Sequence, residues 1–249
     1  MDVIVCVKRV PDTETRIRLG DGAVSIDPGG VKFIMSPYDE YAVEAALRPK
    51  EGAGAGEVTL LSMGDAATQE TLRAGLAMGA DRAVLLSGPV TMDGLATAKA
   101  LAAELKERSA PLILFGVKAA DDDQQQVGPM TATLLGLPCV TGVASFEVRA
   151  DKVVCHREVE GGVEVVEVQL PGVVTITKGI YDPRYASLKG IMAAKKKPLE
   201  QRAAAVAESR LAVEKLAYPP ERAAGRIVGE GPDAAAELVR LLREEANVL

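Results

Sequence analysis

A run of three aspartates and three glutamines makes residues 116–127 the part of this sequence best suited to hold a ligand. The run follows an apolar stretch, residues 112–115, that predicts a buried strand. Asp123 and Gln126 have the D-x-x-Q spacing of a capping box, which predicts that a helix begins there. The turn would then present unpaired first-turn N–H groups and the positive end of a helix dipole, a combination that binds phosphate.

Backbone groups alone could hold such a phosphate, without a lysine. The N–H groups concerned are those near Gln124, Gln125, Gln126 and Val127. The three aspartates argue against a triphosphate with a free anionic tail, because like charges repel. The same run could instead cap a helix that binds nothing. It could also bind Mg²⁺, although capping and contacts to a ribose account for the aspartates with fewer assumptions.

Side chains for catalysis are scarce in the sequence. The one histidine, His156, lies in a predicted hairpin strand, which indicates a surface or structural residue. Cys6, Cys139 and Cys155 stand in apolar contexts without C-x-x-C spacing, so we expect core thiols. The glycines of residues 52–56 precede a strand instead of a helix, which predicts a flexible turn and not a dinucleotide fingerprint. The sequence therefore predicts neither a nucleophile paired with a base nor a metal site.

Composition narrows the class of protein. A length of 249 residues, 48% hydrophobic and 26% charged, fits one large globular domain or a domain with a long appendage. The net charge of −6 and the absence of Trp argue against nucleic-acid binding, because little basic or aromatic surface is left for phosphates and bases. The sequence has no run of 18 apolar residues and no basic leader, so we expect a cytoplasmic protein that does not insert into a membrane.

The elements that must position residues 116–127 alternate between strand and helix patterns. Helices are predicted from Pro37 to a stop at Pro49, and again after a cap at Asp65. The predicted strands cover residues 3–7, 57–63, 83–86 and 112–115. This alternation predicts an α/β fold with a mostly parallel, doubly wound sheet and helices on both of its faces.

Two antiparallel additions are predicted outside the alternating pattern. Residues 17–26 predict a small hairpin around the glycines Gly20 and Gly22. Residues 153–159 and 163–170 predict a larger hairpin, since apolar and polar residues alternate in the second strand.

The chain divides into a domain and an arm. We assign residues 1–198 to an α/β nucleotide-binding domain and residues 199–249 to an extended C-terminal arm. A helix predicted over residues 232–245 carries one apolar face, formed by Leu238, Leu241 and Leu242. A tail of this length would have difficulty burying that face alone, so the helix should pack on its own domain or on another chain.

Five segments in order along the chain resemble the β subunit of electron-transfer flavoprotein. They are residues 5–10, 35–40, 69–82, 116–128 and 182–197. Each segment alone is weakly specific, but five collinear matches over roughly the first four-fifths of the chain are highly specific. The resemblance implies a fold similar to that of the adenine-nucleotide α-hydrolases.

The resemblance also implies a function. The family forms a heterodimer whose α subunit makes most contacts to a redox-active FAD, while the β subunit helps to hold this FAD and binds a structural AMP. Electrons would come from acyl-CoA dehydrogenases of fatty acid oxidation and other flavin dehydrogenases, and would pass to a quinone oxidoreductase. The chain would then be a non-catalytic electron-carrier subunit, because the redox chemistry belongs to the flavin.

Residues matching the family's AMP site come from four segments. On the phosphate side they are Gly116, Lys118, Ala119, Asp121, Asp122, Asp123, Gln124, Gln125, Gln126 and Val127. On the adenosine side they are Cys6, Ser36, Pro37, Tyr38, Asp39 and Met63. A bifurcating branch of the family binds a second FAD in place of AMP. Asp122 in the middle of the acidic triplet favours AMP, whereas residues 126–129 resemble the bifurcating pattern.

Residues 181–197 match the family's recognition loop, in which Leu188 would be an apolar anchor in a pocket of the dehydrogenase. The residues expected to dock partners are Tyr185, Leu188, Ile191, Lys195, Lys196 and Lys197. The three lysines either contact an acidic partner surface or form a solvated basic turn. The alternative function, a free-standing adenine-nucleotide-binding signalling protein, would have no use for this loop or for the arm.

Overall fold

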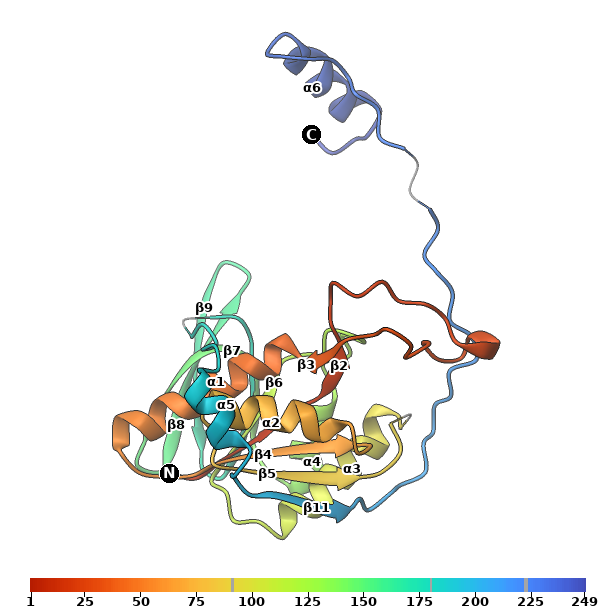
Figure 1. Ribbon diagram of the computed structural model, residues 1–249. Helices are drawn as coiled ribbons and strands as arrows, with labels where there is room; N and C mark the ends of the chain where they lie inside the picture. Colours follow the sequence, from red (N-terminus) through yellow and green to blue (C-terminus); the bar gives the residue numbers. More distant parts are fainter. Residues whose placement is uncertain (91, 180, 222–223) are drawn as a thin grey trace.

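The computed structural model describes residues 1–90, 92–179, 181–221 and 224–249; positions 91, 180, 222 and 223 of the predicted domain and arm lie outside the described residues. A nine-stranded sheet runs through the described domain in the order β11-β5-β4-β1-β6-β10-β7-β8-β9 (Figure 1). Its strands are β1 (Val3–Cys6), β4 (Val58–Gly64), β5 (Arg82–Ser87), β6 (Leu112–Gly116), β7 (Cys139–Arg149), β8 (Lys152–Val159), β9 (Gly162–Gln169), β10 (Gly172–Ile176) and β11 (Leu199–Ala203).

Neighbouring strands from β11 to β7 are parallel, and β8 and β9 add an antiparallel ribbon. The parallel strands are continuous apolar runs because helices cover them on both faces. Val5 of β1 packs with one buried cluster and Ile4 with another, since successive side chains of a strand point to opposite faces. The predicted α/β class, with a doubly wound sheet and an antiparallel addition, is confirmed.

In the described part of the chain, four helices cover the sheet. Helices α1 (Pro37–Ala53) and α2 (Thr68–Met78) supply residues such as Leu47 and Leu76 to one cluster. Helices α3 (Gly94–Lys106) and α4 (Val127–Leu135) supply Leu105 and Ala132 to the other. The cores on the two faces fix the helix ends that approach the carboxyl edge of the sheet.

Several predicted boundaries were wrong. Helix α1 continues past Pro49 to Ala53. Gly54 caps it, since its left-handed backbone (φ 63°) lets its N–H bond to the carbonyl of Glu51. The predicted hairpin at residues 17–26 is an isolated bridge between Leu19 and Ile26 around a short 3₁₀ helix, η1 (Asp21–Ala23). An antiparallel pair that the sequence did not predict, β2 (Arg9–Pro11) with β3 (Phe33–Met35), leads into α1.

The C-terminal arm begins later in the chain than predicted. Residues 199–203 were expected in the arm, but they form β11, which pairs with β5 at the edge of the sheet. The arm then crosses residues 17–26, where the Tyr218 hydroxyl accepts a bond from the N–H of Leu19 (3.2 Å). Figure 1 shows its last helix, α6 (Ala234–Glu244), at the far end of the arm and away from the sheet.

Candidate functional site

The carboxyl ends of β1 and β6 form a topological switch point. From β1 the chain places β4 and β5 on one side, and β6 with β10 on the other. In open α/β sheets the crevice at such a point is where ligands bind. The start of α1 and residues 117–126 both lie at this edge of the sheet.

Asp39 joins three elements at the crevice. Its carboxylate accepts hydrogen bonds from the backbone N–H of Lys8 (2.7 Å), after β1, and from that of Gly116 (3.0 Å), at the end of β6. Burial raises the pKa of Asp39 to about 7, although the two N–H groups oppose that rise. The side chain therefore fixes the floor of the crevice and is not displayed as an open ligand contact.

Gly116 is required by the close approach of α1. A β-carbon at this position would lie 2.4 Å from Oδ1 of Asp39 and 2.8 Å from its backbone nitrogen. No side chain can occupy that space without moving the start of α1.

Two lysines pair with the three aspartates of the acidic loop. Nζ of Lys8 lies 2.8 Å from a carboxylate oxygen of Asp121 and 2.8 Å from one of Asp122. Nζ of Lys118 lies 2.7 Å from Asp123 and 5.5 Å from the centre of the Tyr38 ring. An anion approaching the loop would therefore meet paired carboxylates and not three free negative charges.

The predicted capping box is wrong. Helix α4 begins at Val127 with Gln126 as its N-cap, and the Asp123 carboxylate pairs with Lys118 instead of the helix. The reason is local backbone geometry, because Asp123 (φ 51°) and Gln125 (φ 55°) are left-handed and the chain has not yet entered the helix.

This geometry still favours an anion site. Gln125 is left-handed and Gln126 right-handed, a succession that directs neighbouring N–H groups into one concavity. Within the described residues, the N–H groups of Gln125, Gln126, Val127 and Gly128 have no hydrogen-bond acceptor. The N–H of Gln124, in contrast, donates to Asp122 (3.3 Å), so the free groups begin one residue later than predicted.

The other residues predicted for the site lie around the same edge. Ser36 and Pro37 begin α1, and the buried Ser36 hydroxyl has no hydrogen-bond partner in the described part of the chain. Cys6 is buried, and burial raises the pKa of its thiol. Cys6 belongs to the hydrophobic cluster on the face of the sheet that α3 and α4 cover, and Met63 packs against the same cluster. Ala119 accepts a bond from the N–H of Asp123 (3.0 Å) and so shapes the loop.

Lys8 is the site residue that the sequence did not reveal. Its partners lie 113 and 114 residues away, so no local pattern could show the pairing. The usable signal was its position, directly after the first parallel strand at the edge where ligands bind.

We call residues 181–197 the docking segment, although docking itself is an expectation. The segment was predicted as a loop, but its second half is helix α5 (Leu188–Ala194), which Ser187 caps by accepting a bond from the N–H of Gly190 (3.0 Å). Tyr185 is 99% exposed and Leu188 84% exposed. Ile191, Lys195 and Lys196 are exposed as well. The segment thus displays large apolar side chains beside two lysines.

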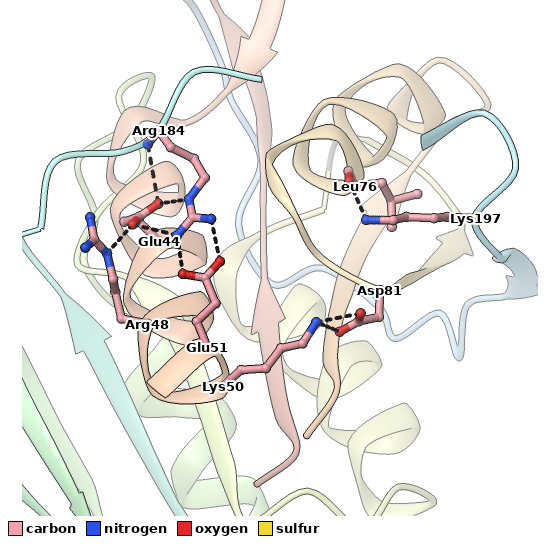
Figure 2. A network of polar contacts seen from close by, with 8 residues as sticks. All are labelled: Glu44, Arg48, Lys50, Glu51, Leu76, Asp81, Arg184 and Lys197. Carbon is pink, nitrogen blue, oxygen red and sulfur yellow. Dashed lines mark hydrogen bonds and ion pairs between the residues drawn. The ribbon is translucent and has the colours of Figure 1, made fainter. Parts of the chain in front are cut away.

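Lys197 does not belong to an exposed basic cluster, contrary to the prediction. Its Nζ donates to the carbonyls of Leu76 (2.9 Å) and Ala80 (2.6 Å), as Figure 2 shows for Leu76. These carbonyls belong to the last turn of α2 and the residues after it, where a cation is favoured. Burial lowers the pKa of Lys197, and the bonds to the two carbonyls direct its ammonium into the fold instead of toward a partner.

A cavity of about 800 Å³ lies between the docking segment, α1 and α2. Met35, Tyr41 and Met78 contribute apolar surface to it from the domain, and Tyr185 and Ile191 contribute from the segment. The turn before α5 therefore borders an opening through Pro183 and Tyr185, while its Ala186 packs against the core.

Neither a metal cluster nor a spanning helix occurs in the described part of the chain. Among the described residues, no three His, Cys, Asp or Glu side chains gather as a metal site would require. No helix in the described ranges has the length and apolarity to span a bilayer.

The fold and the crevice define the class: an open, doubly wound α/β protein whose candidate ligand crevice lies at the strand carboxyl ends. The family described as electron transfer flavoprotein domain matches residues 24–207. The chain is 41% identical to electron transfer flavoprotein subunit beta of Syntrophomonas wolfei (95% of this chain, 93% of that protein) and 43% identical to that of Bradyrhizobium diazoefficiens (100% of both). The human subunit beta is 38% identical (97% of this chain, 98% of that protein). The chain belongs to the electron transfer flavoprotein family, as a β subunit, which confirms the resemblance.

Proposed function

We propose that the chain is the β subunit of a heterodimeric electron carrier, binding a structural AMP at the switch-point crevice and docking flavin dehydrogenases through residues 181–197. The observation that carries the AMP assignment is the row of N–H groups from Gln125 to Gly128, which have no acceptor among the described residues, beside an acidic loop whose aspartates are each paired with Lys8 or Lys118. Family membership supports the electron-carrier role.

FAD, when bound between this chain and the α subunit, supplies the redox chemistry. The chain's own contribution is to bind and to orient. Asp39 and Gly116 keep the crevice in shape, and Tyr38 and Lys118 stand at its mouth on the side of α1. Acyl-CoA dehydrogenases would deliver electrons at the docking segment, and a quinone oxidoreductase would accept them.

The first prediction separates AMP from a second FAD, which residues 126–129 leave as the alternative. The purified chain, without its partner, is expected to be colourless and to release about one AMP per chain on acid denaturation, because the N–H groups at α4 suit a single phosphate. Chromatography of the acid supernatant measures this. Recovery of stoichiometric FAD would overturn the AMP assignment and place the chain in the bifurcating branch.

The second prediction concerns the α subunit. Truncation after Val228 should weaken heterodimer formation and leave the α/β domain folded, because α6 exposes Leu238 (45%) and stands away from the sheet. Size-exclusion chromatography and calorimetric titration with the α subunit measure the loss. A matched control is Arg240→Gln, which removes ion pairs to Glu237 and Glu244 from α6 but keeps its apolar face. Unchanged affinity of the truncated chain would show that α6 is not part of the interface.

A further inference from the structure

Arg184 attaches the turn before α5 to α1. Its backbone N–H donates a long hydrogen bond to Glu44 (3.4 Å), and its side chain makes the shorter contacts. Its Nε lies 2.7 Å from Glu44 and its Nη2 3.0 Å from the other oxygen of the same carboxylate. Its Nη1 and Nη2 also reach both oxygens of Glu51, at 2.6 and 3.0 Å. Figure 2 shows the guanidinium between the two carboxylates, which lie on α1. Two bidentate pairs fix the orientation of the guanidinium as well as its position.

Glu44 makes this attachment rigid. Its side chain is fully buried, and it also accepts a bond from Nε of Arg48 (2.5 Å). Burial acts to raise the pKa of Glu44, but the bonds from Arg184 and Arg48 outweigh it and hold the pKa below its usual value. The carboxylate therefore remains charged, and it would stay paired with Arg48 if Arg184 were removed.

Other contacts fix the far end of the docking segment independently. The guanidinium of Arg73 on α2 donates to the carbonyls of Ala194 (2.5 Å) and Lys197 (2.8 Å). A β-carbon on Gly190 would lie 2.5 Å from the carbonyl oxygen of Ala77, so α5 lies directly against α2. Between this firmly packed helix and the sheet, the turn borders the 800 Å³ cavity.

We infer that Arg184 is a positioning residue for docking: by pairing with Glu44 and Glu51 it holds the turn that presents Tyr185 and Leu188 to a partner. This inference rests on the proposed docking function. Pro183 and Tyr185 of the turn border the cavity and only Ala186 packs against the core, so few apolar contacts would replace the ion pairs. A turn ordered in advance spares the entropy that a mobile one would lose on binding, so the effect should appear in affinity and not in the rate of electron transfer within the complex.

The test uses the heterodimer with its flavin, carrying Arg184→Met. Hydrogen exchange of the amides in residues 181–189 should become about tenfold faster or more, since local opening costs less. In stopped-flow reduction by an acyl-CoA dehydrogenase, the half-saturating concentration should rise about tenfold with the limiting rate unchanged. Arg184→Lys should lie between the wild type and Arg184→Met, because an ammonium cannot form both bidentate pairs.

Arg202→Met is the matched control. Arg202 also pairs with several glutamates, among them Glu104 and Glu200, but on β11 and away from the segment. It should change neither the exchange of residues 181–189 nor the half-saturating concentration.

A double-mutant cycle with Leu188→Ala decides whether Arg184 acts through the anchor. In the Leu188→Ala background, Arg184→Met should raise the half-saturating concentration by a clearly smaller factor than in the wild-type background, because the anchor is gone and only Tyr185 is left for the turn to position. An equal factor in both backgrounds, or unchanged exchange in Arg184→Met, would overturn the inference. If Leu188→Ala alone leaves the half-saturating concentration unchanged, the proposed docking function of this segment is wrong. Any effect of Arg184→Met would then not act through the anchor, so the inference about Arg184 would be wrong as well.

Discussion

Replacing Leu188 by alanine is expected to weaken docking of dehydrogenases by one to two orders of magnitude. Leu188 is 84% exposed at the first residue of α5, so the free protein gains little from it. Burying a leucine in a partner pocket is worth roughly 1.5–3 kcal/mol, which corresponds to about ten- to a hundredfold in affinity. Stopped-flow reduction of the flavin at varied dehydrogenase concentration measures the change.

The flavin spectrum, its potential and the nucleotide content should stay as in the wild type, because Leu188 is an exposed side chain on α5 and is not among the residues proposed to hold a nucleotide. Val163→Ala is the control, since Val163 is also a large exposed apolar residue (61%) but lies on β9. Equal loss in both variants would indicate a general surface effect. An unchanged rate for Leu188→Ala with every donor tested would mean that the docking assignment must be withdrawn.

The parallel core was predictable because burial on both faces leaves a continuous apolar signal in the sequence. The predicted strand at residues 57–63, for example, is β4 at Val58–Gly64. Two strands of the sheet, β7 and β10, were missed although β10 (GVVTI) is buried throughout and carries that signal. The other strands that were missed carry no such signal. β2 and β3 have three residues each, and β11 has the mostly exposed sequence LEQRA. β11 is a strand because β5 offers it a parallel edge, which is a tertiary cause.

The sequence predicted where the site lies, but not the hydrogen bonds and ion pairs within it. A strand followed by a helix located the loop after Gly116, and that much depends only on local sequence. The roles of Asp39 and Lys8 depend on partners that are distant in the chain, such as Gly116 for Asp39 and Asp121 for Lys8. The prediction for Lys197 was wrong for the same reason. Three adjacent lysines cannot be told apart in the sequence, and only the fold places the end of α2 beside Lys197.

Gly116→Ala is expected to lower the free energy of unfolding by about 1–3 kcal/mol, the usual cost of overpacking a close-packed interior. The new β-carbon would meet the backbone and carboxylate of Asp39 at 2.4 to 2.8 Å. Because backbone atoms cannot turn aside as a flexible side chain does, α1 or the end of β6 must shift. Both hold the crevice, so the AMP released on denaturation should fall well below one per chain. Thermal unfolding and nucleotide analysis of the same preparation measure the two effects.

Gly52→Ala separates this steric effect from the general effect of replacing a glycine. Gly52 lies in the last turns of α1, and a β-carbon there would meet no atom within 4 Å. Since alanine favours the helix, this variant should gain about 0.5–1 kcal/mol and keep its nucleotide. If Gly116→Ala unfolded at the wild-type temperature and still released a full equivalent of AMP, the start of α1 would not be held against β6 as the Asp39 contacts require, and the proposed role of Asp39 and Gly116 in the crevice would be wrong.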